Sequence, residues 1–147
     1  LQIDSRSVHA HIIGEHGDSE LPVWSLANVA GTALTLSAEQ KEFVFTNTRD
    51  AAYQIIEAKG STYYAIALAL DRICTAILRN EAAVLNVSAL LTNYHGLSDV
   101  YLGVPCIIDR NGIRDTLSLA LTEKEKELLH ASAAKLRGVI DSISKPL

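Results

Sequence analysis

The sequence lacks methionine and contains only two cysteines and 5% aromatic residues. Two cysteines are too few for a disulfide framework and suit a reducing compartment, so we expect a cytoplasmic protein. A net charge of −4 argues against nucleic-acid binding, which relies on clustered Lys and Arg. No apolar run is long enough to cross a bilayer, so we expect no membrane partner. Because the chain begins at Leu1 without a methionine, we expect it to be a piece of a longer polypeptide.

What the sequence does contain is enough apolar residues for a folded domain. Its 147 residues are 48% hydrophobic and 20% charged, which excludes a disordered chain. No repeat, charge block or Pro/Ser-rich linker divides it, so we expect one folded unit over residues 1–147. Neither of the glycine-rich motifs that cradle nucleotide phosphates is present.

The hydrophobic periodicity predicts both helices and antiparallel strands. The predicted elements are a strand over 7–13, an extended segment over 22–31, helices over 38–59 and from 61 or 62 to 79, strands over 85–91 and 100–108, a hairpin turn at Asn111-Gly112, a returning strand over 117–121 and a final helix after Thr122. Segregated elements of this kind are typical of an α+β fold, here with long helices packed on an antiparallel meander.

Local signals mark the ends of the predicted helices. Ser37 with Gln40, and Thr122 with Glu125, have the spacing of capping boxes, and Gly60 suits the end of the first long helix. Two helices also carry apolar residues at helical spacing, and we expect both stripes to face a core. The stripes are Ile66, Leu70, Ile73 and Ile77 in one helix, and Leu129, Ala133, Leu136, Ile140 and Ile143 in the last.

Three histidines lie close together near the start of the chain. His9 and His11 are two residues apart on the predicted strand, so both side chains would point to the same face. With His16 they suggest one alternative, a small metal-dependent hydrolase, with Asp18 or Glu15 as a further ligand. The chain offers no closing set of ligands, however, so we expect no metal and interpret His9 and His11 as residues of a half-exposed strand edge.

His16 has a different setting, because it lies in a tight turn between Gly14 and Gly17. Glycines beside an imidazole remove side-chain bulk, so a small substrate can approach it. Histidine also exchanges protons near neutral pH, which suits a general acid or base. These residues alone leave a structural or merely exposed histidine as the alternative.

Several segments resemble, in the same order, the bacterial NAD-dependent L-lactate dehydrogenases. The type that they resemble is activated by fructose 1,6-bisphosphate. The similar segments are Val8 to Gly31 (VHAHIIGEHGDSELPVWSLANVAG), Asp50 to Tyr53 (DAAY), Lys59 to Thr62 (KGST), Leu102 to Cys106 (LGVPC) and Asn111 to Ile113 (NGI). The resemblance continues to the final helix and covers only the substrate-binding, C-terminal domain of that family. It is weakest between residues 31 and 44, where the chain looks shorter than typical relatives.

The resemblance implies a role for each of five residues. His16 matches the histidine that donates a proton to pyruvate and accepts one from L-lactate. Thr62 matches the threonine beside the substrate side chain, although it would also suit a helix N-cap. Ile66 matches the apolar residue near the nicotinamide, although it also belongs to the core stripe. His9 matches a histidine at the fructose 1,6-bisphosphate site, and Tyr53 coincides with a position phosphorylated in some bacterial relatives, although a packing role suits its helix.

The resemblance also implies what this chain needs for activity. The family binds NAD mainly through an N-terminal Rossmann domain, and that domain, the substrate-binding arginines and the aspartate that orients the histidine would all precede Leu1. We therefore expect a homotetrameric enzyme of fermentation when intact, and no activity from residues 1–147 alone. A related 2-hydroxyacid dehydrogenase of the hydroxyisocaproate or malate type is an alternative, although Thr62 argues against malate. An assembly module without chemistry is a third.

Overall fold

The computed structural model describes residues 2–143, which form two compact units. Unit 1 comprises the chain up to Thr35, then Asn86–Pro105, and the part from Leu117 onward. Unit 2 comprises Leu36–Leu85 and Cys106–Thr116. The helices and antiparallel strands confirm the predicted α+β class.

Short elements form the first part of unit 1. They are the 3-10 helix η1 (Ser5–Ser7), strands β1 (Val8–His9), β2 (Ile12–Ile13) and β3 (Leu21–Pro22), the 3-10 helix η2 (Trp24–Leu26), and strands β4 (Asn28–Val29) and β5 (Thr32–Ala33). The single strand predicted over 7–13 is wrong, because β1 pairs with β4 whereas β2 pairs with β3. The extended segment predicted over 22–31 is likewise interrupted, by η2.

A two-residue turn joins β4 to β5. Val29 pairs with Thr32, so only Ala30 and Gly31 form the loop, and their φ angles are +51° and +80°. Two successive positive φ angles define the type I′ geometry that suits the right-handed twist of a hairpin.

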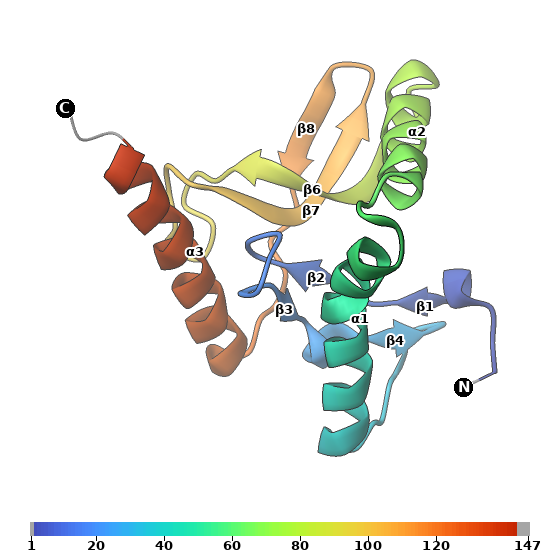
Figure 1. The fold of residues 1–147 in the computed structure, drawn as a ribbon. Coiled ribbons are helices and arrows are strands. Elements are labelled where there is room, and N and C mark those ends of the chain that lie inside the picture. Colours follow the sequence, from blue (N-terminus) through green and yellow to red (C-terminus); the bar gives the residue numbers. More distant parts are fainter. Residues whose placement is uncertain (1, 144–147) are drawn as a thin grey trace. The chain divides into compact units, whose positions relative to one another are not determined.

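Three longer strands form the main sheet in the order β6, β7, β8 (Figure 1). They are β6 (Ala83–Leu90), β7 (Tyr101–Asp109) and β8 (Gly112–Thr116), and both β6 and β7 pass from one unit to the other. The predicted alternation in β7 is confirmed, since Leu102, Val104, Cys106 and Ile108 are all buried.

The hairpin from β7 to β8 differs from its prediction in two ways. Asp109 pairs with Gly112, so the turn residues are Arg110 and Asn111, and Gly112, at φ +93°, already belongs to β8. The strand predicted over 117–121 is wrong, because β8 ends at Thr116. Its apolar residues serve the core instead, and Leu121 is buried outside any strand.

Helix α3 (Glu123–Ile143) completes unit 1 (Figure 1). The predicted capping box is confirmed: the Thr122 amide donates to the Glu125 carboxylate at 2.9 Å, and the Glu125 amide donates to Thr122 Oγ1 at 3.3 Å. Leu129 is fully buried, but Ile143 is 77% exposed. The predicted core stripe is therefore correct for the first half of the helix and wrong for its end.

Unit 2 contains the two other long helices, α1 (Ala38–Lys59) and α2 (Tyr64–Leu78). The capping box of Ser37 and Gln40 is confirmed, and Gly60 ends α1 at φ +86°. Helix α2 begins at Tyr64 with Tyr63 as its N-cap, so the prediction that Thr62 caps this helix is wrong.

The apolar stripe of α2 is only partly covered. Ile66 is 51% exposed and Leu70 is 56% exposed, whereas Ile73 and Ile77 are half-buried. The expectation that the whole stripe faces a core is therefore wrong for its first half. Despite this apolar character, no helix within residues 2–143 is long and apolar enough to cross a membrane.

Candidate functional site

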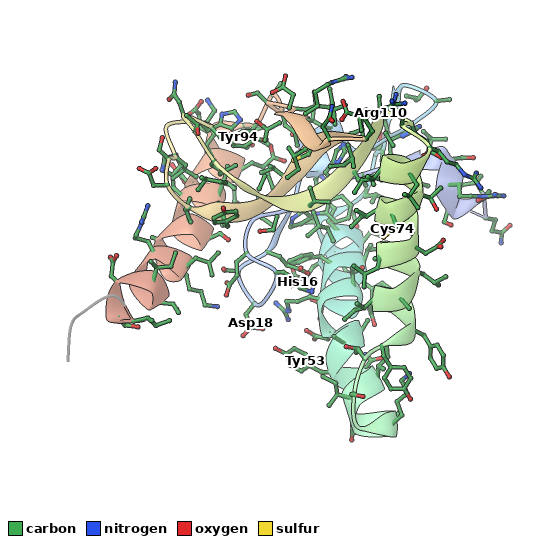
Figure 2. The ribbon with its side chains drawn as sticks, turned by 90° about the horizontal axis from the view of Figure 1, so that it is seen from above. His16, Asp18, Tyr53, Cys74, Tyr94 and Arg110 are labelled. Atoms are coloured by element: carbon green, nitrogen blue, oxygen red, sulfur yellow. The ribbon has the colours of Figure 1, made fainter. Side chains whose placement is uncertain are left out.

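His16 and Asp18 lie at the tip of the loop that joins β2 to β3 (Figure 2). Both residues are exposed, whereas Ile13 and Gly14 at the root of the loop are buried. The imidazole is thus carried by a short loop whose root belongs to the core. This arrangement presents a proton-exchanging group to a ligand without burying it.

The root of the loop is bonded to strand β7. Gly14 donates its amide to the carbonyl of Gly103 at 2.9 Å, and Gly103 donates back to the carbonyl of Gly14 at 2.8 Å. The φ angle of Gly14 is +99°, which side chains rarely allow. A Cβ on Gly103 would lie 3.1 Å from the carbonyl oxygen of Gly14, so both glycines serve this close approach.

A polar cluster connects the same loop to helix α3. The Glu15 amide donates to Ser132 Oγ at 2.7 Å. The Glu15 carboxylate accepts a hydrogen bond from the Ser19 hydroxyl and lies 3.2 Å from Lys135 Nζ. The Ser19 hydroxyl lowers the pKa of Glu15 most, and Lys135 lowers it further, although desolvation opposes them. Glu15 is therefore held as a carboxylate, with Ser19 and Lys135 both contacting its Oε2 atom.

The other two histidines of the sequence cluster have separate surroundings. His9 is exposed on β1, and His11 lies between β1 and β2 with its Nδ1 atom 3.2 Å from Asn86 Oδ1. The break between the two strands removes the reason for placing His9 and His11 on one face. Among residues 2–143, no three His, Cys, Asp or Glu side chains are grouped so as to hold a metal ion.

The remaining predicted site residues belong to unit 2. Thr62 is half-buried in the connection between α1 and α2, Ile66 lies in the first turns of α2, and Tyr53 is 58% exposed on α1. The connection is braced by Lys59, whose Nζ lies 3.7 Å from the ring centroid of Tyr63. A cation over an aromatic face stabilises such a corner. The roles of these residues remain predictions.

Sequence reasoning missed three residues that hold the His16 loop, namely Gly103, Ser132 and Lys135. Each is distant along the chain from residue 16, so no local motif connects them. One weak signal does exist: Ser132 stands three residues after Leu129, on the apolar face of α3, and it is fully buried. A serine in such a stripe indicates a hydrogen bond to another segment.

Sequence comparison identifies the class to which this fold and loop belong. Residues 1–146 match the alpha/beta C-terminal domain of the lactate/malate dehydrogenases, so the chain belongs to that family.

Among individual proteins, the chain is 53% identical to the L-lactate dehydrogenase of Bacillus caldotenax over 142 residues, which cover 91% of this chain and 45% of that protein. It is 52% identical to L-lactate dehydrogenase 1 of Staphylococcus aureus (strain JH9) over 147 residues, 95% of this chain and 46% of that protein. The chain therefore spans less than half the length of these relatives.

Solved structures agree with this assignment. The minor L-lactate dehydrogenase from Enterococcus mundtii, in its ligands-bound form, superposes with a TM-score of 0.93 at 40% identity, covering 98% of this chain and 48% of that one. A lactate dehydrogenase from a Medee basin deep-sea metagenome library superposes with a TM-score of 0.92 at 42% identity, covering 97% and 48%. The predicted fold type is thereby confirmed.

Proposed function

We propose that the chain is the C-terminal, substrate-binding part of a cytoplasmic L-lactate dehydrogenase that interconverts pyruvate and L-lactate. The observation that carries this proposal is the identity of 53% to an L-lactate dehydrogenase over 91% of the chain. The exposed histidine on a glycine-flanked loop supports it, because reduction of a carbonyl requires a positioned proton donor.

In this function His16 carries the proton. The imidazolium donates it to the carbonyl oxygen of pyruvate as negative charge develops there, and the neutral imidazole accepts it from the hydroxyl of L-lactate. NADH supplies the hydride when bound, and NAD accepts it in the reverse direction. The exposure of His16 at the loop tip of this chain supports this role, because the imidazole must reach a small 2-keto acid.

Thr62 and Ile66 are proposed to contact substrate and cofactor. The threonine is uncharged and half-buried, which suits a neighbour as small as the methyl group of pyruvate. Ile66 exposes half of its side chain on α2, and an apolar surface of this kind fits one face of a nicotinamide ring. Neither residue supplies the cation that the second carboxylate of a malate-type substrate requires.

The test uses a fused enzyme in which residues 1–147 follow the N-terminal half of the L-lactate dehydrogenase of Bacillus caldotenax. We expect it to reduce pyruvate with NADH, and we expect residues 1–147 alone to be inactive. His16→Ala should lower kcat by several powers of ten, whereas His11→Ala, the matched control, should leave kcat unchanged.

Three outcomes contradict the proposal: an inactive fused enzyme, undiminished turnover by His16→Ala, or a preference for oxaloacetate over pyruvate. Preference for branched 2-keto acids would favour a hydroxyisocaproate-type enzyme instead.

We further propose that fructose 1,6-bisphosphate activates the intact enzyme as a homotetramer, with His9 contributing to the effector site. His9 is exposed on a strand edge, and its protonated imidazole attracts a phosphate. His9→Ala in the fused enzyme should raise the effector concentration needed for half-maximal activation and leave unactivated turnover unchanged. An unchanged activation curve would rule this out.

Tyr53 is proposed as a phosphorylation site, because its side chain is 58% exposed on α1. Treatment of residues 1–147 with a bacterial tyrosine kinase, followed by peptide mass spectrometry, tests this. Phosphate on Tyr63 or Tyr64 but not on Tyr53 would contradict it.

A further inference from the structure

We propose that Ser132, on α3, is a positioning residue for His16, and that Glu15, Ser19 and Lys135 complete a clamp that holds the His16 loop on this helix. The proposal rests on the proton-transfer role proposed above for His16. None of these four side chains needs to touch a substrate, since each acts through the backbone that carries the imidazole.

The first observation is the bond between Ser132 and the residue next to His16. Ser132 is fully buried, and its Oγ accepts the backbone N–H of Glu15 at 2.7 Å. This N–H belongs to the residue immediately before His16, so the bond restrains the backbone just before it enters His16. A buried hydroxyl used in this way resists displacement, because the amide would otherwise lose its acceptor.

The second observation is how closely the loop root approaches the same hydroxyl. A Cβ on Gly14 would lie only 2.7 Å from Ser132 Oγ. The backbone therefore rests against Ser132 at a distance that glycine alone permits. On its other side, Gly14 exchanges two hydrogen bonds with Gly103, so the root is held between β7 and α3.

The third observation concerns the other end of the loop. Ser19 Oγ lies 3.3 Å from Ser132 Oγ and also donates to the Glu15 carboxylate. Lys135, one turn further along α3, lies 3.2 Å from that carboxylate. Contacts with α3 thus secure the loop on both sides of His16, while the imidazole itself stays exposed.

Such a clamp matters for proton transfer because the reaction depends steeply on distance. A displacement of about 1 Å at a catalytic group costs roughly a hundredfold in rate. Loss of the Ser132 hydroxyl frees the Glu15 amide from α3 and lets the imidazole sample other positions. An interaction that is made only in the transition state affects kcat and leaves KM unchanged, so we expect the loss to fall mainly on kcat.

The experiment compares Ser132→Ala with Ser142→Ala in the fused enzyme. Ser142 is a matched control, since it lies on the same helix, is exposed, and donates its hydroxyl to the backbone carbonyl of Val139 in α3. We expect Ser132→Ala to lower kcat for pyruvate about tenfold or more with KM within about twofold, and Ser142→Ala to leave both unchanged. In residues 1–147, the Glu15 amide, which donates to Ser132, should exchange hydrogen faster in Ser132→Ala but not in Ser142→Ala.

Ser19→Ala provides a second variant in case Ser132→Ala fails to fold. It removes one hydroxyl from the cluster and keeps the bond from Glu15 to Ser132, so kcat should fall about fivefold, the equivalent of one hydrogen bond. If Ser132→Ala folds and keeps the wild-type kcat, the proposal is overturned. If Ser132→Ala does not fold, a wild-type kcat in Ser19→Ala overturns it instead. A loss of kcat that Ser142→Ala shares also overturns it.

His16→Ala separates this failure from failure of the proposed function. If His16→Ala keeps its turnover, the role of His16 itself is wrong. If His16→Ala is inactive while the Ser132 and Ser19 variants retain wild-type kcat, the role of His16 stands and the positioning role of Ser132 is wrong.

Discussion

Replacement of Gly14 by alanine is the most direct test of how the His16 loop is built. The φ angle of +99° is strained for any side chain, at a cost of about 1–2 kcal/mol. The added Cβ would also meet Ser132 Oγ at 2.7 Å and Leu21 Cδ2 at 3.3 Å. Because both neighbours are buried, they yield little, and overpacking of this kind costs about 1–3 kcal/mol more. We expect Gly14→Ala to lower the free energy of unfolding by about 2–5 kcal/mol.

Gly31→Ala is the matched control within the same unit. Gly31 has a φ angle of +80°, but nothing lies within 4 Å of the position of a Cβ. It should therefore lose only the backbone part, about 1–2 kcal/mol. The difference between the two variants measures the steric contact in the loop root separately from the strain of a positive φ angle.

Urea unfolding followed by fluorescence provides the measurement. The only tryptophan of the sequence, Trp24, lies in unit 1 with both glycines, so its signal reports the unit that is changed. Equal destabilisation by Gly14→Ala and Gly31→Ala would refute the steric argument. In the double variant Gly14→Ala/Ser132→Ala the combined loss should be smaller than the sum, because the hydroxyl that opposes the new methyl group is gone. Strict additivity would exclude Ser132 as the opposing group.

Three further predictions concern the core and its polar groups. Desolvation is the largest single effect on Glu125 and raises its pKa, but the hydrogen bonds from Ser25 and Thr122 together outweigh it, so the pKa is lowered. The carboxylate therefore stabilises the fold above pH 4.5 and stops doing so as pH falls through the lower folded pKa. Glu125→Gln should thus lower the free energy of unfolding by about 1–3 kcal/mol at pH 7. Its free energy of unfolding should also fall less steeply than that of the unchanged chain as the pH is lowered. An unchanged urea midpoint at pH 7 would contradict this. Leu129 is fully buried, so Leu129→Ala should lower the free energy of unfolding by about 2–5 kcal/mol. Its neighbour Leu128 is 46% exposed, so Leu128→Ala should lower it much less. Equal losses in the two variants would be incompatible with this difference in burial. Burial raises the pKa of the Cys106 thiol, whereas Cys74 is exposed. A thiol reagent should therefore label Cys74 in the folded chain and Cys106 only after unfolding. Equal labelling rates at the two cysteines in the folded chain would contradict the fold.

The features that could be predicted from the sequence are those decided within a few residues. A capping box joins residues three apart, so Ser37 with Gln40 and Thr122 with Glu125 needed no knowledge of the rest of the chain. Gly60 ended α1 for a similarly local reason, since a helix C-terminus favours a residue with positive φ.

The clamp on the His16 loop was beyond sequence reasoning because it joins distant segments. The bond between Glu15 and Ser132 spans 117 residues. A glycine at position 14 suggested freedom for an approaching substrate, whereas the structure shows that it also allows close contact with Ser132 and Gly103. Which reason dominates at a glycine depends on neighbours that the sequence alone does not identify.

Periodicity predicted which face of each helix is apolar but not what lies against it. In α2 the stripe is regular, yet Ile66 and Leu70 remain more than half exposed. The strand predicted over 7–13 failed for a related reason. Its residues favour extended backbone throughout, but the choice of two different partner strands divides it at Ala10 and His11.

The turn between β4 and β5 shows where this chain has stability still to be gained. Alanine is poorly suited to a φ angle of +51°, and its presence at position 30 retains about 1 kcal/mol of strain in every folded molecule. Asparagine accepts the same geometry and is favoured before glycine in type I′ turns. We therefore expect Ala30→Asn to raise the thermal stability of the chain, because it relieves the backbone strain in this turn.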